Sequence, residues 1–546
     1  MTIDHDLEHD LVPDTHSDTL TDARVVDDHD AVVDPGHRHD DGDGRLTSVA
    51  RRFVPTWDRR LGLGVAVGIA ATWGALAGWW TPRGPLTTGQ ALWSIGLGLV
   101  VGLTGGFLAR TRWAMLAAPI AFVALFELVR LPTDGPTVDS IETSTYGILA
   151  LVVGRGFHGL LSLFPMLLGA ALGAGAARRF EPDRTRPTRR AGVVMRRGVA
   201  VLSSVALVAL VIGLARPART DAIVDANGDV VAASIAELTT IDVAGHDLGL
   251  MIRGHDTDNP VLLFLAGGPG GSERGAMRNH LAELERHFTV VTWDQRGTGT
   301  SYDELDPTGT ITLQGFVDDT DAVTDHLRER FDQDRIYLLG QSWGSTLGVL
   351  AVQQHPEKYL AFIGVGQMVS QRATDTIFYD DTLEWARTTG NDDLVAELEA
   401  IGPPPYERML DYESALSYEH EVYPYDHEPN AEGEGGFSEN FLVEEYALID
   451  QVHLLAGFMD TFSVLYPQLQ DIDFAQTATT FDVPVFFVQG AHEADGRAEP
   501  FDAWFSTIDA PIKDVVLLST SGHRPMFEQP DEFVDYMVDT VLARTT

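Results

Sequence analysis

Hydrophobic residues are distributed unevenly along the chain. Five long apolar stretches occupy its first 215 residues, at about 61–80, 90–109, 113–131, 157–177 and 199–215. Each has about the 17 to 25 residues that a helix needs to cross a bilayer, and none shows the polar face of a soluble surface helix. The pattern therefore predicts an all-helical transmembrane region over residues 53–215, with about five helices.

Arginine residues indicate how these stretches are oriented, because positive residues near span ends are retained in the cytoplasm. They gather before the first stretch, between the second and third, and between the fourth and fifth: Arg51, Arg52, Arg59, Arg60, Arg110, Arg112, Arg178, Arg179, Arg184, Arg186, Arg189, Arg190, Arg196 and Arg197. Five spans with a cytoplasmic N-terminus place everything after Ala215 outside the cell. A sixth span, for which Tyr146–Val153 is the candidate, would return the rest of the chain to the cytoplasm.

The segments that flank this region are polar. Residues 1–52 form an acidic tail rich in Asp and His without a sustained apolar run, so we expect disorder there. The six histidines of this tail lack the fixed spacing of a ligand set, and no metal site is expected. Residues 216–240 are interpreted as a linker, with a turn at Asn227-Gly228. The formal net charge of −42 argues against a nucleic-acid partner, because phosphate binding needs clustered Lys and Arg.

From residue 241 to 546 the pattern changes to short β-branched runs that alternate with amphipathic helices, which is typical of an α/β sheet. The strand-like runs lie at 261–266, 290–294, 335–341, 483–489 and 515–518. The stretch from about 370 to 475 is acidic and helical, and it lies between two of these runs. We interpret it as a helical cap on an α/β domain.

One loop of this half has the pattern of a nucleophile. Gly340-Gln341-Ser342-Trp343-Gly344 is a G-x-S-x-G sequence that follows a strand and precedes a helical run. A serine on a sharp turn from strand to helix has a strained backbone, which only small flanking residues permit, and its hydroxyl is exposed to the cleft. The motif in this context predicts an α/β-hydrolase fold with Ser342 as the nucleophile.

A glycine-rich loop provides candidates for the oxyanion hole. Gly267-Gly268-Pro269-Gly270-Gly271 follows the strand at 261–266, where a hydrolase needs a backbone N–H to stabilise a tetrahedral intermediate. Gly268 presents its amide without a side chain in the way. The second donor is predicted to be the amide of Trp343, the residue after the nucleophile.

The base and the acid are expected after the nucleophile, since the chain order Ser, acid, His is the one that this fold uses. His523 lies on a loop after the run at 515–518, and a histidine there can accept the serine proton. The acid is expected on the loop after 483–489, which holds Glu493 and Asp495. We favour Glu493 and keep Asp495 as the alternative. This chemistry requires neither a metal nor another cofactor.

Four motifs in this order resemble those of the proline iminopeptidase (prolyl aminopeptidase) family of α/β-hydrolases. They are GGPGG at 267–271, WDQRGTGTS at 293–301, GQSWGSTL at 340–347 and SGHRPMFEQP at 521–530. The resemblance implies Ser342 as nucleophile, His523 as base, and Asp294 with Arg296 as a structural pair. It also implies release of an N-terminal residue, often proline, from a small peptide.

The chain departs from this family at two positions. The family usually has His where this chain has Ala266, and Asp where it has Glu493. Family members use cap glutamates to hold the substrate ammonium, for which Glu444 and Glu445 are candidates. Two other functions stay open: an esterase, lactonase or amidase that acts on small lipophilic molecules, and a membrane sensor whose hydrolase-like domain only binds a ligand.

Overall fold

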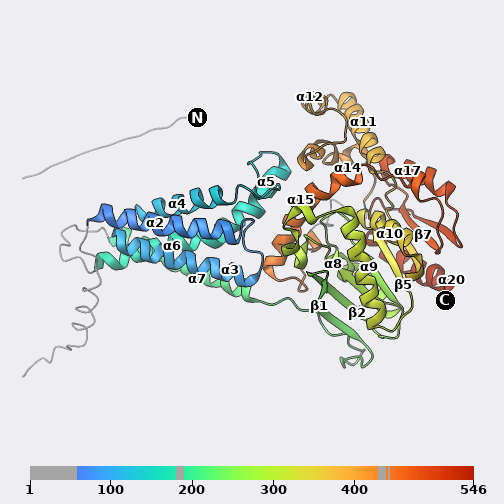
Figure 1. Cartoon of the computed structure of the whole chain (residues 1–546), viewed down its shortest axis with the longest axis horizontal. Helices are drawn as coiled ribbons and strands as arrows, with labels where there is room; N and C mark the ends of the chain where they lie inside the picture. The colour runs from blue at the N-terminus through green and yellow to red at the C-terminus, as the bar shows by residue number, and fades with distance from the viewer. Residues whose placement is uncertain (1–57, 180–189, 428–437, 441–442, 546) are drawn as a thin grey trace, which may run out of the picture. The chain divides into compact units, whose positions relative to one another are not determined.

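The N-terminal part of the structure is entirely helical. The computed structural model describes residues 58–179, 190–427, 438–440 and 443–545. The helices of this part are α2 (Arg59–Trp80), α3 (Thr88–Ala109), α4 (Ala114–Val129), α5 (Thr145–Leu151), the π-helix η1 (Val152–Gly156), α6 (Phe157–Arg179) and α7 (Arg190–Ala215) (Figure 1). We call residues 59–215 the helical region. The histidine-rich tail lies outside the described residues.

Two details of the helical region bear on the number of spans. The third apolar stretch forms α4, which at 16 residues is shorter than a usual span. The run Tyr146–Val153 is not a separate span, because α5, η1 and α6 form one continuous helical stretch, Thr145–Arg179. Four helices of this region and α15 (Leu448–Leu469) are long and apolar enough to cross a membrane.

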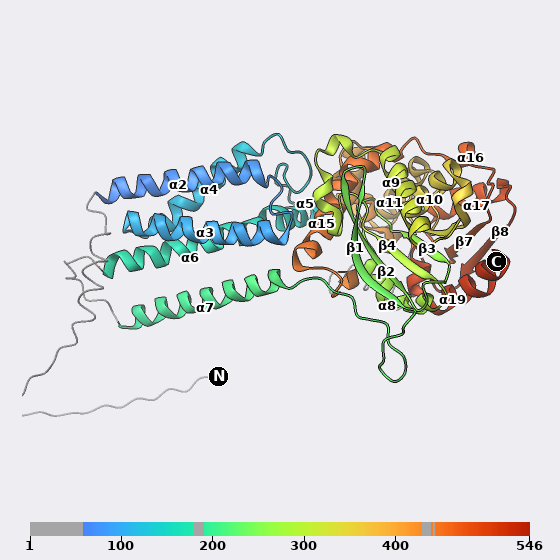
Figure 2. The ribbon, with the colours of Figure 1, turned by 60° about the horizontal axis from the view of Figure 1, so that its bottom comes forward.

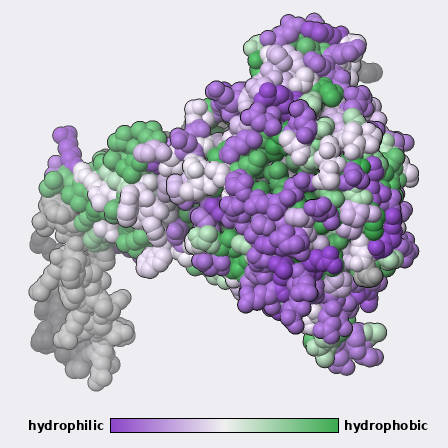
Figure 3. Space-filling model, turned by 45° about the vertical axis from the view of Figure 1, so that its right-hand side comes forward, coloured by the Kyte–Doolittle hydropathy of each residue, from purple (hydrophilic) through white to green (hydrophobic). Residues whose placement is uncertain are grey.

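The surface of the helical region is apolar. The structure exposes many large hydrophobic side chains, and among the described residues all of them except Val224, Val230 and Leu517 lie between Leu61 and Ile212. The hydropathy view shows this contrast, with apolar patches over the helices and a mainly polar surface over the C-terminal half (Figure 3). An apolar surface of this extent marks a contact with lipid or another apolar partner.

The C-terminal half is built on an eight-stranded sheet with the order β1-β2-β4-β3-β5-β6-β7-β8. Its strands are β1 (Ile235–Val243), β2 (His246–Gly254), β3 (Val261–Leu265), β4 (Thr289–Trp293), β5 (Ile336–Gln341), β6 (Tyr359–Val365), β7 (Val485–Gly490) and β8 (Lys513–Leu518), and Figure 2 labels all of them except β5 and β6. β1 and β2 form an antiparallel hairpin, and the strands from β4 to β8 are parallel. The predicted α/β-hydrolase fold class is confirmed.

Helices cover both faces of the sheet, as the alternation of side chains along a strand requires. In β3, Leu263 packs in one apolar cluster, whereas Leu262 and Phe264 pack in the other. The first face is covered by α9 (Leu313–Arg330), α10 (Trp343–Gln354) and α17 (Asp495–Thr507), and the second by α8 (Arg274–His280), α18 (Pro525–Glu528) and α19 (Pro530–Tyr536). The carboxyl ends of the parallel strands therefore lie between two helical layers.

A helical segment is inserted between β6 and β7. It holds α11 (Gln371–Thr389), α12 (Asp392–Ile401), α13 (Glu413–Leu416), α14 (Glu419–Val422), α15 and α16 (Phe474–Thr477). The five strand-like runs of the sequence correspond to β3, β4, β5, β7 and β8. β1, β2 and β6 were not predicted, and β1 begins at Ile235, inside the range that we interpreted as a linker.

Candidate active site

Ser342 lies on the sharp turn that joins β5 to α10. Its backbone has φ +53° and ψ −120°, a strained conformation for a residue with a side chain. A Cβ atom at Gly340 would overlap the carbonyl oxygen of Gly344, and one at Gly344 would overlap that of Leu265. Both glycines are therefore required by the close approach of the backbone around the serine, as the motif predicts.

The structure brings Ser342, His523 and Glu493 together in one chain of hydrogen bonds. His523 Nε2 lies 2.9 Å from Ser342 Oγ, and His523 Nδ1 lies 2.7 Å from Glu493 Oε2. The alternative acid, Asp495, is the exposed first residue of α17 and does not contact the imidazole. These three side chains are separated by 181 and 30 positions in the sequence.

Glu493 is held as a carboxylate by a neighbouring guanidinium. Its side chain is only 4% exposed, and Arg497 Nε donates to its Oε1 at 2.7 Å. Burial alone would raise the pKa of Glu493, but the charges of Arg497 and His523 outweigh burial and lower this pKa to about 2. Glu493 is thus ionised over the whole range in which an imidazole titrates.

A second carboxylate shapes the loop that carries His523. Glu528 Oε1 accepts hydrogen bonds from the backbone N–H groups of Gly522, at 3.2 Å, and Arg524, at 3.1 Å. Tyr425 donates its hydroxyl to the other oxygen of Glu528 at 3.0 Å. The residues on both sides of His523 are therefore fixed, which limits the positions that the imidazole can take.

The two predicted oxyanion donors, Gly268 and Trp343, both line the cavity that contains Ser342 and His523. The amide of Gly267, next to Gly268, is already used, because it donates to Glu273 at 3.1 Å. Trp343 is the first residue of α10, so its N–H lacks the carbonyl of a preceding turn.

The catalytic cavity has a volume of about 450 Å³ and lies beneath the inserted helices. One side is apolar and is formed by Leu454, Phe458 and Phe462 of α15. Another side is acidic, because Asp375 of α11 lines the same space. A cavity of this size, with one apolar wall and many polar groups elsewhere in its lining, suits a small organic substrate that has both apolar and polar parts.

Asp375 is a buried carboxylate whose hydrogen-bond donors are neutral. It accepts from Tyr466 at 2.6 Å, Gln470 at 2.7 Å and Gln371 at 3.0 Å. Burial raises the pKa of Asp375 to about 6, although these hydrogen bonds lower it. In the part of the chain that the structure describes, no Lys or Arg pairs with Asp375. A cation in the cavity would therefore be stabilised at this position.

The two candidates for the partner of the substrate ammonium lie away from the catalytic cavity. Glu444 pairs with Arg216 and Arg219, and Glu445 pairs with Arg278, so neither lines the catalytic cavity.

The expected pair in the DQRG turn does not form either. Asp294 contacts Arg274 at 2.9 Å, whereas Arg296 donates to Asp319 of α9 at 2.9 Å, so each of the two residues has a partner from another part of the fold. Both groups nevertheless have structural contacts rather than contacts with the cavity.

Sequence reasoning missed Arg497, Glu528 and Asp375. Arg497 carries a usable signal, because it lies four residues after Glu493 at the start of a helix, where charged pairs face each other. Asp375 carries none, since its place in the cavity depends on how α11 packs against α15.

Comparison with known proteins places the C-terminal half in a family. A protein-family model described as the alpha/beta hydrolase fold matches residues 260–530. A probable aminopeptidase of Bacillus subtilis is 29% identical over 313 residues, which cover 55% of this chain and 95% of the relative. A probable proline iminopeptidase of Leptolyngbya boryana is 26% identical over 291 residues, 50% of this chain and 84% of the relative.

Among solved structures, the proline iminopeptidase of Mycobacterium smegmatis has 18% sequence identity and a TM-score of 0.41, and the match covers 57% of this chain and 98% of that one. The chain therefore carries an α/β-hydrolase domain and is a hydrolase. Within that class its domain is similar to proline iminopeptidases, which confirms the resemblance of the four motifs.

Proposed function

We propose that this protein is a membrane-anchored serine hydrolase that releases N-terminal residues from small peptides. The observation that carries the proposal is the chain of hydrogen bonds from Ser342 through His523 to Glu493, beside a cavity of substrate size. The similarity to relatives that are named as aminopeptidases and proline iminopeptidases supports the peptide substrate.

The mechanism forms and then breaks an acyl-enzyme. Ser342 Oγ attacks the scissile carbonyl carbon and its proton passes to His523 Nε2. The amides of Gly268 and Trp343 stabilise the oxyanion, and His523 then protonates the leaving amine. A water molecule, activated by the same imidazole, hydrolyses the ester on Ser342. Glu493 orients the imidazole and stabilises the imidazolium without accepting the proton itself.

Asp375 is the group that we assign to the substrate ammonium. An aminopeptidase must recognise the free N-terminus, and a buried carboxylate with neutral partners gains most from a cationic ligand. Asp375 takes the role that the sequence analysis gave to Glu444 or Glu445.

We also propose that the helical region anchors the enzyme in a membrane, with its N-terminus in the cytoplasm and the hydrolase domain outside. The apolar surface between Leu61 and Ile212 supports the anchoring. We count five crossings, α2, α3, the shorter α4, the continuous stretch Thr145–Arg179 and α7, because Tyr146–Val153 adds no separate one. The alternate arginine-rich loops support the direction.

An esterase is the second candidate function, because the wall of Leu454, Phe458 and Phe462 would accommodate an apolar acyl group. The two functions separate in one assay of the full-length protein in detergent micelles. We expect prolyl arylamide with a free amine to be cleaved, and its N-acetyl derivative and simple acyl esters to be poor substrates. Cleavage of esters but not of free aminoacyl amides would show the esterase instead.

Substitution of the nucleophile tests the chemistry itself. Ser342→Ala is expected to lower kcat by about 10⁶-fold and to abolish labelling by a fluorophosphonate. Ser140→Ala changes an exposed serine that does not line the catalytic cavity, and is the matched control. A folded wild-type protein that is not labelled would favour the ligand-binding sensor. Labelling of intact cells by a membrane-impermeant probe reports the side of the membrane.

A further inference from the structure

Helix α15 lies between the catalytic cavity and the helical region. Residues four apart along it, Leu454, Phe458, Phe462 and Tyr466, face the cavity. The rings of Phe462 and Tyr466 stack with their centroids 4.2 Å apart, which makes this face a continuous apolar wall. The position of the wall is therefore set by whatever holds α15.

The opposite face of α15 is held by residues of the helical region. Asp460 accepts hydrogen bonds from Thr137 Oγ1 at 2.6 Å and from the Thr137 amide at 3.1 Å, and it pairs with Arg83 at 3.1 Å. Tyr302 of the hydrolase half donates to the same carboxylate at 2.8 Å. Asp460 and Arg83 are each about 1% exposed, so this network is fully removed from water. Such a network fixes one geometry, because a displaced partner would leave a buried charge unpaired.

A residue of the helical region also reaches the catalytic cavity itself. Tyr146, in the first turn of α5, lines the cavity that contains Ser342. Its backbone N–H donates to Glu413 of the inserted helices at 3.1 Å, and its ring packs against the apolar cluster to which Phe462 belongs. Tyr146 therefore adds to the wall that α15 provides.

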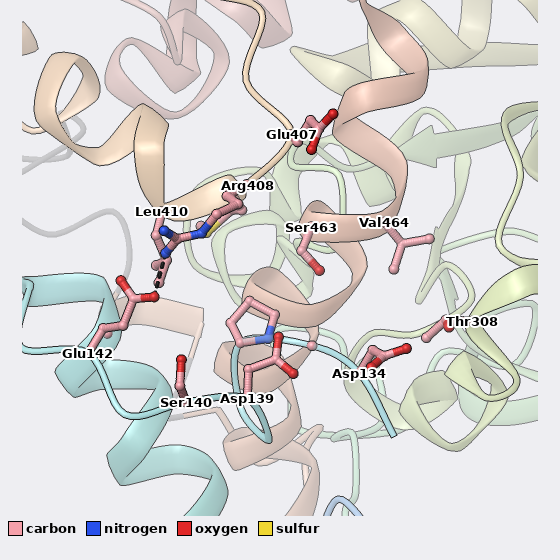
Figure 4. Close-up of a pocket in the computed structure, with 14 residues that line it drawn as sticks. Asp134, Asp139, Ser140, Glu142, Thr308, Glu407, Arg408, Leu410, Ser463 and Val464 are labelled. Carbon is pink, nitrogen blue, oxygen red and sulfur yellow. Dashed lines mark hydrogen bonds and ion pairs between the residues drawn. The ribbon is translucent and has the colours of Figure 1, made fainter. Parts of the chain in front are cut away.

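The residue after Tyr146 faces a different space. Gly147 lines a second cavity of about 650 Å³, together with Asp139, Glu142 and Arg408. Figure 4 shows this cavity between the loop that precedes α5 and the inserted helices, with Glu142 bonded to Arg408. The first turn of α5 is thus a partition, with the catalytic cavity on one side and an acidic cavity on the other.

We propose that Tyr146 is a specificity-determining residue, and that the helical region completes the substrate cavity in addition to anchoring the enzyme. Tyr146, Leu454 and Phe458 would bind a bulky apolar group of the substrate, such as a large hydrophobic side chain next to the scissile bond. The proposal rests on the proposed function only in taking the Ser342 cavity as the site of reaction. It gives a reason for the multi-helix region, since a single anchoring helix would not supply this wall.

Changes in the size of residue 146 test this proposal. The readout is the ratio of kcat/KM for a bulky apolar aminoacyl arylamide to that for the alanyl one. Tyr146→Trp fills the cavity and is expected to lower the ratio by about tenfold or more, whereas Tyr146→Ala enlarges it and is expected to raise the ratio by about tenfold. Tyr146→Phe keeps the ring and should leave the ratio within about twofold.

A second readout separates this proposal from the peptidase function. The rates at which a small and a bulky fluorophosphonate label Ser342 are compared in the same variants, which requires no peptide substrate. Ser140→Ala, on the side of the acidic cavity, is the control and should leave both ratios unchanged.

Opposite shifts of the probe ratio in Tyr146→Trp and Tyr146→Ala support the proposal, even if no aminoacyl amide is cleaved. Unchanged ratios, or equal losses for small and bulky probes in both variants, would overturn it, because a purely structural role predicts the same direction for both.

Discussion

The catalytic cavity and the acidic cavity of Figure 4 differ in the hydrogen bonds of their polar groups, a difference that cavity volume does not reveal. The acidic cavity is the larger, about 650 Å³ against about 450 Å³, and it too holds carboxylates and serines. Its described lining contains no histidine. Ser463 there donates to the carbonyl of Asp460 within its own helix, at 2.7 Å, whereas Ser342 is bonded to an imidazole. Connectivity between groups, rather than volume, distinguishes a site of reaction.

The backbone makes the same distinction. Ser463 lies within the regular helix α15, but Ser342 has a positive φ that its neighbours Gly340 and Gly344 make possible. Strained conformations persist only where the surrounding structure enforces them, and they gather at functional sites. The comparison therefore predicts that substitutions on the two sides of the first turn of α5 have very different effects on activity.

The largest of these effects is expected for Glu493→Gln. An amide in this position would favour the wrong tautomer of His523, and kcat should fall by about 10⁴-fold. Because Glu493 has a pKa of about 2, it is fully ionised above about pH 4, and its titration should not change the wild-type kcat in that range. The measurement is kcat against pH for both proteins. Glu142→Gln, on the acidic cavity, should retain at least about half of the wild-type kcat; an equal loss in both variants would contradict the comparison.

Asp460→Asn should have the next largest effect, on stability. It removes the charge that pairs with Arg83 in a buried network, and we expect a loss of about 3 kcal/mol in the free energy of unfolding. This value is near the lower end for a broken buried ion pair, because Asp306 still binds Arg83. Thermal unfolding in detergent measures it. In Asp139→Asn the change should stay within about 0.5 kcal/mol, since burial raises the pKa of Asp139 and already disfavours its charge. Equal losses would show that the Asp460 network has no special role.

Asp375→Asn should have the smallest effect of the three, and only on substrates with a free amine. Loss of one buried ion pair should lower kcat/KM for these substrates by about 10²-fold and leave N-acetyl substrates within about threefold. In the wild type, the ratio of the two should rise as the pH increases through about 6, where Asp375 becomes charged, and fall above about 8, where the substrate amine loses its proton. The titration of His523 cancels in this ratio. A ratio that is flat across this range, in wild type as in variant, would reject Asp375 as the ammonium partner.

The sequence was sufficient for the groups that local motifs encode. Ser342 and His523 lie in motifs whose glycines indicate a turn of the backbone. Glu493 follows a strand that is recognisable from its β-branched and aromatic residues. The strands β3, β4, β5, β7 and β8 were recognisable for the same reason, whereas β6 was missed although it lies between β5 and β7. The hairpin β1–β2 was missed because Thr239, Thr240 and Asp242 interrupt its apolar pattern, although its pairing with β4 makes it part of the sheet.

The groups that the sequence did not reveal are those whose roles depend on tertiary packing. Asp375 resembles any acidic residue of an amphipathic helix until Tyr466 and Gln470 enclose it. Tyr146 belongs to an apolar run that suggests a membrane segment, and its place in the catalytic cavity depends on contacts such as that with Glu413, 267 positions away. Arg296 pairs with Asp319, 23 positions away, whereas the chain order favours the nearby Asp294.

The location of Asp460 has a practical consequence for work on the hydrolase half alone. A shortened protein that starts after Ala215 would lack Arg83 and Thr137, so the carboxylate of Asp460, which is buried in the full chain, would be exposed to solvent. Asp460 lies on α15, which is hydrophobic enough to enter a membrane. Such a fragment would self-associate through this helix, and its catalytic cavity would be open where Tyr146 is missing. The substrate selectivity measured on the fragment would then reflect the truncation and not the full-length enzyme.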